Sequence, residues 1–248
     1  MEDKELVLKT CLKAGKIMTE SGSEVYRVED TMSRIAQNAG YPQSVSYVTA
    51  TGLFMGLGEE PITQLANVMK RSIDLEKVAI VNQLSRQYQR KELSLAEFYD
   101  ALKNLDKYKT TYSWSWQIFS AAVVSCTLVY LFFTNLQDIL PAFLIGGLGY
   151  GVDKAANKFF EISFLNDFLA AFTIGVLAIC SVRLGFGNNI DAIIIGAVMP
   201  LVPGVSITNS FRDILAGHLL AGTARIMEAF FTAGAIGIGI AISLKLFF

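Results

Sequence analysis

Residues 191–228 form an apolar segment that is interrupted and then continues with charged residues. The interruption consists of Pro200, Pro203 and Gly204. A proline removes a backbone donor and clashes with the preceding turn, so at bilayer depth the freed carbonyls need partners from protein, water or solute. Broken helices with polar flanks are a recurring way to build a binding site near the membrane midplane. The alternative is a kinked helix that ends at the membrane interface, with Arg212 and Asp213 in water.

The charged residues divide the chain into two halves. Residues 1–113 hold 15 of the 21 Lys and Arg and 15 of the 22 Asp and Glu, which leaves 6 and 7 for residues 114–248. The mean hydropathy of +0.43 is high for a soluble domain. The sequence therefore predicts an α-helical integral membrane protein with about five transmembrane helices, one of them broken or re-entrant, preceded by a small α+β cytoplasmic domain. We place the domains at residues 1–112 and 113–248.

The pattern of the first half predicts helices around three strands. Helices are expected over residues 4–20, 25–39 and 74–90, with a short fourth helix after residue 94. Ser21 to Glu24 and Ser94 to Glu97 both match the capping-box pattern, a serine three residues before a glutamate. Val, Thr, Tyr and Phe enrich residues 44–57, which predicts one or two strands with a bend near Gly52, and residues 62–70 predict a third.

A charged cluster in the second helix has two interpretations. Glu24, Arg27 and Glu29 lie close together in the sequence, and Asp30 follows. Ion pairs along the surface of one helix explain this spacing. The functional alternative is a contact between Glu24, Arg27 or Glu29 and the membrane half or a partner protein.

Several functional classes lack support in this sequence. We expect no catalytic residues, no metal site and no cofactor, because no nucleophile motif, metal-binding motif or phosphate loop occurs and the one histidine is His218. Basic and acidic residues are balanced in the first half, so we expect no nucleic-acid partner. The three cysteines form no motif.

The second half predicts five membrane spans. They are expected at residues 114–133, 139–156, 162–182, 190–208 and 222–247. Asp167 lies near the start of the third span, at the interface or facing a cavity. Arg225 lies early in the fifth, where an unpaired arginine at the bilayer centre would cost about 2.5–3.5 kcal/mol, so we expect it to be paired or near the interface.

The distribution of Lys and Arg predicts the orientation. The loops on one side would carry Lys154, Lys158 and Arg212, and the other side only Arg183 and Lys245. The first residues contain no continuous apolar segment, so we expect no cleaved signal peptide. The sequence therefore predicts a multi-pass protein of the plasma membrane with a cytoplasmic amino-terminal domain.

Four segments give the chain a resemblance to a known family. They are SGSEVYRVEDTM (21–32), VNQLSR (81–86), MPLVPGVSITNSFRD (199–213) and AGTARIMEA (221–229). In these the chain resembles the threonine/serine exporter family over nearly its whole length. Full-length members fuse two membrane units of about ten spans in all. This chain is similar to the larger subunit of the split members, in which a short membrane protein supplies the second unit.

The resemblance implies a function. We expect a subunit of a secondary transporter that exports a small polar metabolite across the lipid bilayer. The substrate would be serine, threonine or a dicarboxylate such as succinate, the export would be proton-coupled, and the partner would be the short membrane subunit. Three alternatives stay open: a homo-oligomeric carrier, a membrane-anchored regulatory or binding protein that acts through its cytoplasmic domain, and a membrane enzyme.

Residue types around the break then suggest roles in a substrate pathway. A helix that begins after Pro203 and Gly204 would offer free N–H groups and a positive dipole end to a carboxylate. Thr208 and Asn209 could add hydrogen bonds, and Arg212 or Arg225 could supply a counter-charge. Asp213, Glu228 or Asp167 could carry a coupling proton. The predicted pathway consists of Asp167, Pro200, Pro203, Gly204, Thr208, Asn209, Arg212, Asp213, Arg225 and Glu228.

Overall fold

The computed structural model describes residues 3–58, 63–69, 72–108, 112–133, 136–159 and 163–247. These residues form two compact units. One unit joins Met1–Thr110 to Val205–Ile226, and the other joins Thr111–Gly204 to Met227–Phe248. The segment Val205–Ile226, which the sequence analysis placed in the membrane domain, therefore clusters with the amino-terminal residues.

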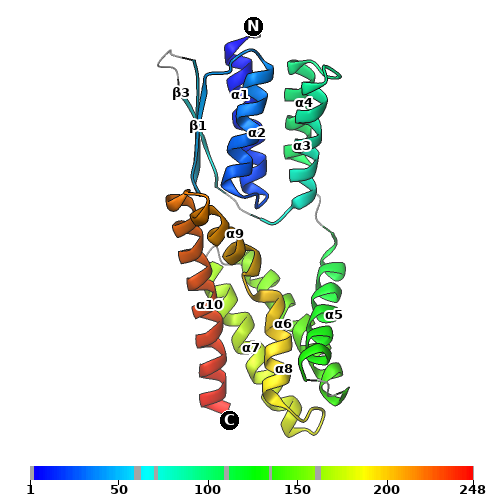
Figure 1. Cartoon of the computed structure of the whole chain (residues 1–248). Helices are drawn as coiled ribbons and strands as arrows, with labels where there is room; N and C mark the ends of the chain where they lie inside the picture. Colours follow the sequence, from blue (N-terminus) through cyan, green and yellow to red (C-terminus); the bar gives the residue numbers. More distant parts are fainter. Residues whose placement is uncertain are drawn as a thin grey trace. The chain divides into compact units, whose positions relative to one another are not determined.

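The first unit is a small α+β structure (Figure 1). Its α+β character is confirmed, and the helices begin and end close to the predicted positions. The elements are α1 (Lys4–Glu20), α2 (Val25–Asn38), β1 (Ser44–Val48), β2 (Gly52–Leu57), β3 (Thr63–Asn67), α3 (Leu75–Gln89), α4 (Leu95–Lys107), α9 (Gly204–Leu215) and the first turns of α10 (Leu219–Phe247).

The three strands form an antiparallel sheet in the order β1-β2-β3. The register pairs Tyr47 with Phe54 and Phe54 with Leu65. The predicted bend before Gly52 is a tight connection, in which the Thr49 hydroxyl accepts a hydrogen bond of 3.0 Å from the backbone N–H of Gly52. Alternation along β2 buries Leu53, Met55 and Leu57 and leaves Phe54 partly exposed, as expected for a sheet with one covered face.

Helix α1 lies at the centre of this unit. It packs against α2, α4, α3 and the sheet, so that α1 and α2 stand between the strands and the α3–α4 pair (Figure 1). The approach to α2 is close, because a Cβ on Gly15 would lie 2.5 Å from the sulfur of Met32. Among the largest fully buried side chains are Leu8, Ile17 and Phe98.

Two predicted helix ends in the first unit are present in the structure. Ser94 and Glu97 form a capping box, in which each side chain accepts a hydrogen bond from the backbone N–H of the other. Helix α2 ends at Asn38, and Gly40, two residues later, has a φ of +93°, a left-handed conformation that glycine adopts without strain. At both of these helix ends, neighbouring residues in the sequence determine where the helix begins or ends.

The second unit is built from helices. Its elements are α5 (Trp114–Phe133), the 3-10 turn η1 (Leu136–Asp138), α6 (Ile139–Phe159), α7 (Ser163–Arg183), α8 (Ile190–Val198), the 3-10 turn η2 (Met199–Leu201) and the rest of α10. Helix α6 packs against α5, α7 and α8. A Cβ on Gly149 would lie 2.4 Å from Ile174, so this glycine sets the distance between α6 and α7.

Three of the described helices are long and apolar enough to cross a membrane: α5, α7 and α10. The segment from α8 and η2 to α9 is a fourth candidate if it counts as one broken span. The break predicted at Pro200 and Pro203 is therefore present. Helix α6 occupies the second predicted span but carries Asp153, Lys154 and Lys158. It is not among the helices that are both long and apolar enough to cross a membrane. Five spans stay a prediction.

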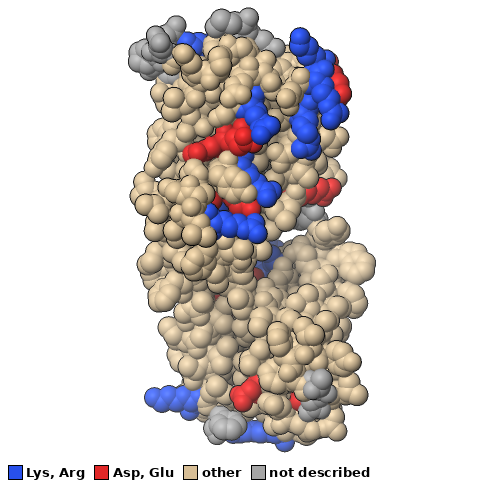
Figure 2. All heavy atoms as spheres, in the orientation of Figure 1, with Lys and Arg blue, Asp and Glu red and all other residues tan. Residues whose placement is uncertain are grey.

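Charged side chains are unevenly distributed between the two units. On the face shown in Figure 2, Lys, Arg, Asp and Glu gather over the first unit, and the middle of the second unit is almost uncharged. Apolar side chains are exposed in this unit, for example Leu131, Leu144 and Phe230. A surface that faces lipid requires such side chains. The second unit is therefore the membrane unit of this chain.

Candidate functional site

The amino end of α2 receives its cap from a distant part of the chain. The backbone N–H of Val25 donates a hydrogen bond of 2.9 Å to Oδ1 of Asp213 in α9. The residue before α2 is Glu24, whose side chain makes no capping hydrogen bond, and Ser21 instead follows the last residue of α1. The capping box predicted at Ser21 to Glu24 is therefore wrong, because a tertiary carboxylate occupies the place that a local side chain would fill.

Asp213 also forms a buried ion pair. Its Oδ2 lies 3.1 Å from a guanidinium nitrogen of Arg225 in α10, and a second nitrogen of Arg225 donates to the carbonyl of Ser23 at 3.0 Å. Asp213 is fully buried and Arg225 is 6% exposed. The expectation that Arg225 is paired is confirmed. Removal of either partner would leave a buried charge without compensation, which is costly.

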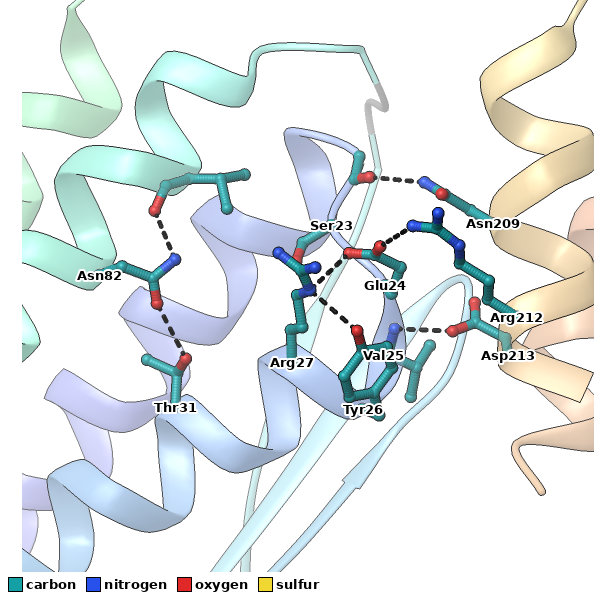
Figure 3. A network of polar contacts seen from close by, with 12 residues as sticks. Ser23, Glu24, Val25, Tyr26, Arg27, Thr31, Asn82, Asn209, Arg212 and Asp213 are labelled. Atoms are coloured by element: carbon teal, nitrogen blue, oxygen red, sulfur yellow. Dashed lines mark hydrogen bonds and ion pairs between the residues drawn. The ribbon is translucent and has the colours of Figure 1, made fainter. Parts of the chain in front are cut away.

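A second group of contacts adjoins the first (Figure 3), and its two arginines, Arg27 and Arg212, are exposed. Arg212 binds Oε1 of Glu24 at 2.9 Å, and Arg27 binds the other carboxylate oxygen of Glu24 at 3.1 Å. The amide of Asn209 donates to the carbonyl of Gly22 at 3.0 Å. We call the whole set the Asp213 network: Gly22, Ser23, Glu24, Val25, Arg27, Asn209, Arg212, Asp213 and Arg225.

Glu29 connects the same helix to the turn between α9 and α10. Its Oε1 accepts a hydrogen bond of 3.0 Å from the backbone N–H of Val48 in β1. Its Oε2 lies 3.8 Å from Nδ1 of His218, an ion pair when the histidine is protonated. Glu24 and Glu29, which the sequence analysis considered as contacts of the domain, thus touch the α9–α10 hairpin directly, and Arg27 reaches it through Glu24.

The predicted pathway residues separate into groups in the structure. Asn209, Arg212, Asp213 and Arg225 meet in the Asp213 network, within the first unit. Pro200 lies in η2 and Pro203 follows it, so that Gly204 and Thr208 fall in the first turns of α9. Asp167 and Glu228 belong to the second unit.

Asp167 lies among polar side chains of α6 and α10. It is hydrogen-bonded to Thr232 and close enough to Asp153 for electrostatic interaction. Beside it, the amide of Asn166 donates to Asn157 at 2.9 Å, and Asn157 donates to a carboxylate oxygen of Asp153 at 2.9 Å. Asp167 is half-buried among these side chains, and its position at the interface or facing a cavity stays a prediction.

A hollow that the sequence did not predict lies beside the break. It has a volume of about 500 Å³ and is lined by Tyr112, Trp116, Gln117, Ser120, Ala121, Val124, Tyr150 and Pro200. All of these residues belong to the second unit. A signal for it existed in the sequence, because Gln117 and Ser120 are polar residues three apart, on one face of a mostly apolar helix.

Comparison with known proteins gives two matches. A family model described as "Putative threonine/serine exporter" matches residues 9–247. A curated protein of Mycobacterium tuberculosis (strain ATCC 25618 / H37Rv), named "Probable threonine/serine exporter", is 23% identical over 96% of this chain and 46% of its own length. The chain thus spans about half the length of that relative. No solved structure matches the chain.

Proposed function

Because this chain belongs to the threonine/serine exporter family, we propose that it is part of a secondary transporter that exports a small polar metabolite. The observation that carries the proposal is the match to the family over residues 9–247, which includes both units. The break at Pro200 and Pro203, between α8 and α9, supports it, because discontinuous helices build solute sites in transporters. The proposed substrates are serine, threonine or a dicarboxylate, and the proposed driving force is the proton gradient.

We further propose that a second membrane unit, carried by a short subunit of the same family, completes the transporter. The described residues contain three candidate spans, or four with the broken one. The relative from Mycobacterium tuberculosis is more than twice as long as the part that this chain matches. A carrier built from two such units would enclose a pathway that one unit alone leaves open to lipid.

The contacts of the Asp213 network refine the roles proposed for its charges. Arg225 is bound to Asp213 and to the carbonyl of Ser23, so a substrate carboxylate would have to displace both. We propose instead that Asp213 and Arg225 are positioning residues, which hold the α9–α10 hairpin against α2. Of the two arginines, Arg212 is the more accessible to a solute, because its side chain is 56% exposed and is bound to Glu24.

Efflux from cells tests the proposed function. Cells that lack their own exporters are loaded with labelled serine, threonine or succinate, and the chain is expressed alone and together with its candidate short subunit. We expect efflux of one substrate class that requires both proteins and falls when the proton gradient is dissipated. Absence of efflux in every combination, with both proteins shown to be in the membrane, would contradict the proposal.

Single variants test the proposed pathway. Arg212→Gln, Asp213→Asn, Arg225→Gln and Glu228→Gln should each lower the efflux rate at equal amounts of folded protein in the membrane. An exposed arginine away from the network, Arg34, which pairs with Asp30 on the surface of α2, provides the control variant Arg34→Gln. Normal efflux by all four variants would contradict both the pathway roles of Arg212 and Glu228 and the positioning roles of Asp213 and Arg225.

A further inference from the structure

The hollow beside Pro200 has the size and position of a solute site. Its volume of about 500 Å³ lies within the range of small-molecule pockets, roughly 300–1,000 Å³. Residues of α5 spaced about one helical turn apart form most of its wall, and Tyr150 of α6 and Pro200 of η2 complete the lining. The hollow therefore borders the point at which the helix of the broken span is interrupted.

Its polar groups are held in defined positions. The side-chain amide of Gln117 donates a hydrogen bond of 2.7 Å to the carbonyl of Tyr112. The hydroxyl of Tyr150 donates to the amide oxygen of Gln117 at 3.4 Å, a long bond that a stronger acceptor could replace. A few fixed polar groups in a largely apolar wall are typical of sites that orient a small ligand.

The charge of the lining limits what it can bind. None of the eight lining residues is charged at neutral pH, and three of them present aromatic rings: Tyr112, Trp116 and Tyr150. The ammonium of Lys154 lies 5.3 Å from the ring centre of Tyr150. An ammonium group of a ligand is attracted to aromatic faces. A carboxylate would find no charged partner among the lining residues, and a dicarboxylate would meet this desolvation cost twice.

From these observations we infer that the hollow binds the exported solute, and that Gln117 and Tyr150 are its polar contacts. The ligand class that fits is a small zwitterion, with one ammonium and one carboxylate, rather than a dicarboxylate. This inference rests on the proposed function and adds the site and its selectivity. Pro200 forms part of the wall, so a conformational change of the broken segment would change the shape of the hollow. Solute binding would therefore be coupled to the conformation of that segment.

Tryptophan fluorescence provides a direct test. The chain has two tryptophans, and only Trp116 lines the hollow. The variant Trp114→Phe retains Trp116, Trp116→Phe retains Trp114, and a variant without both supplies the background of any partner subunit. Each is purified in the form that exports and reconstituted into phosphatidylcholine vesicles. We expect a saturable change of Trp116 emission with L-serine or L-threonine, no saturable change with succinate, and no response of Trp114.

Two outcomes of this test would overturn the inference. One is a Trp114→Phe protein that exports normally while Trp116 does not respond to the exported solute. The other is an emission change that follows the acyl-chain length of the vesicle lipid and not the solute, which would make the hollow a lipid contact.

Export by substituted proteins provides the second readout. Gln117→Leu and Tyr150→Phe each remove one hydrogen-bonding group and keep the shape of the side chain. Loss of one such bond should raise the half-saturating solute concentration about threefold to tenfold. The controls are Thr127→Val and Tyr130→Phe, each of which removes a hydroxyl from α5 outside the hollow. If the unaltered protein exports and both Gln117→Leu and Tyr150→Phe match it, the inference fails and the proposed function stands. If the unaltered protein exports nothing, the proposed function fails first.

Discussion

Asp213 caps a helix that begins 188 residues earlier in the chain: its Oδ1 accepts the backbone N–H of Val25 at 2.9 Å. The same carboxylate binds Arg225, which in turn binds the carbonyl of Ser23. The negative charge lies at the positive end of the α2 dipole. One buried carboxylate thus joins α2, α9 and α10, and the amino-terminal helices and the α9–α10 hairpin form one compact unit.

Loss of Arg225 should destabilise the protein strongly. Arg225→Met leaves Asp213 buried without its counter-charge, at a cost of about 3–5 kcal/mol, whereas Arg34→Met removes an exposed pair worth about 0–1 kcal/mol. Thermal unfolding of the purified protein measures both. The double variant Asp213→Asn/Arg225→Met should recover part of the loss. Equal melting temperatures for Arg225→Met and Arg34→Met would show that the buried pair contributes little.

The α9–α10 hairpin should not tolerate an alanine at Gly222. A Cβ there would lie 2.5 Å from the Ile214 side chain and 2.9 Å from the carbonyl of Ser210, and such overpacking costs about 1–3 kcal/mol. The same substitution at Gly234, also in α10, has no atom within 4 Å and should gain about 0.5–1 kcal/mol from helix propensity. We expect Gly222→Ala to lower the melting temperature and the export rate, and Gly234→Ala to lower neither. A reversed order would contradict the packing described for α9 and α10.

The Cys11 thiol should be protected from alkylation. Burial raises the pKa of Cys11 to about 12, so at pH 8 almost no thiolate forms and reagents cannot reach it. Mass spectrometry after iodoacetamide treatment should find Cys11 modified only when urea unfolds the first unit. Because the folded state holds this proton more tightly, the stability it contributes is complete below pH 9.0 and declines as the pH rises towards about 12. Rapid modification of the folded protein would show that α1 opens locally.

The first turn of α4 should lose protection in acid. Hydrogen bonds from the backbone and hydroxyl of Ser94 lower the pKa of Glu97. The stability that this capping box contributes is therefore present above the ordinary glutamate pKa of 4.5 and is lost as the pH falls through the lowered value. Hydrogen exchange of α4, compared between pH 7 and pH 3 after correction for the intrinsic rate, should show the loss. Glu97→Ala should abolish the pH dependence, and Glu92→Ala, at an exposed residue outside the box, should retain it.

Local sequence signals predicted the parts of the fold that depend on neighbouring residues. Ser94 and Glu97 lie three residues apart and form a capping box. Gly40 lies two residues after the end of α2 and has the left-handed φ that glycine favours. Ser21 to Glu24 has the same pattern but forms no capping box, because the carboxylate of Asp213 caps the amino end of α2. The helix after the break continues to Leu215, past the predicted limit at residue 208.

The contacts between distant segments were harder to predict. The sequence identified Arg212, Asp213 and Arg225 as important residues near the break, but it did not show that they bind Ser23, Glu24 and Val25. It also did not reveal the hollow, because the list of spans does not specify which face of α5 meets α6 and η2. Hydrophobic periodicity identifies helices, and side-chain packing between them decides where polar groups converge.

The length of α10 has a consequence for depth in the membrane. Its 29 residues extend about 43 Å at 1.5 Å per residue, and the hydrocarbon layer is about 30 Å thick. When the carboxyl end stays within that layer, roughly nine residues at the amino end project beyond it, which is where the two units divide, between Ile226 and Met227. Arg225 is among those projecting residues, so the length of α10 alone keeps its guanidinium out of the hydrocarbon layer.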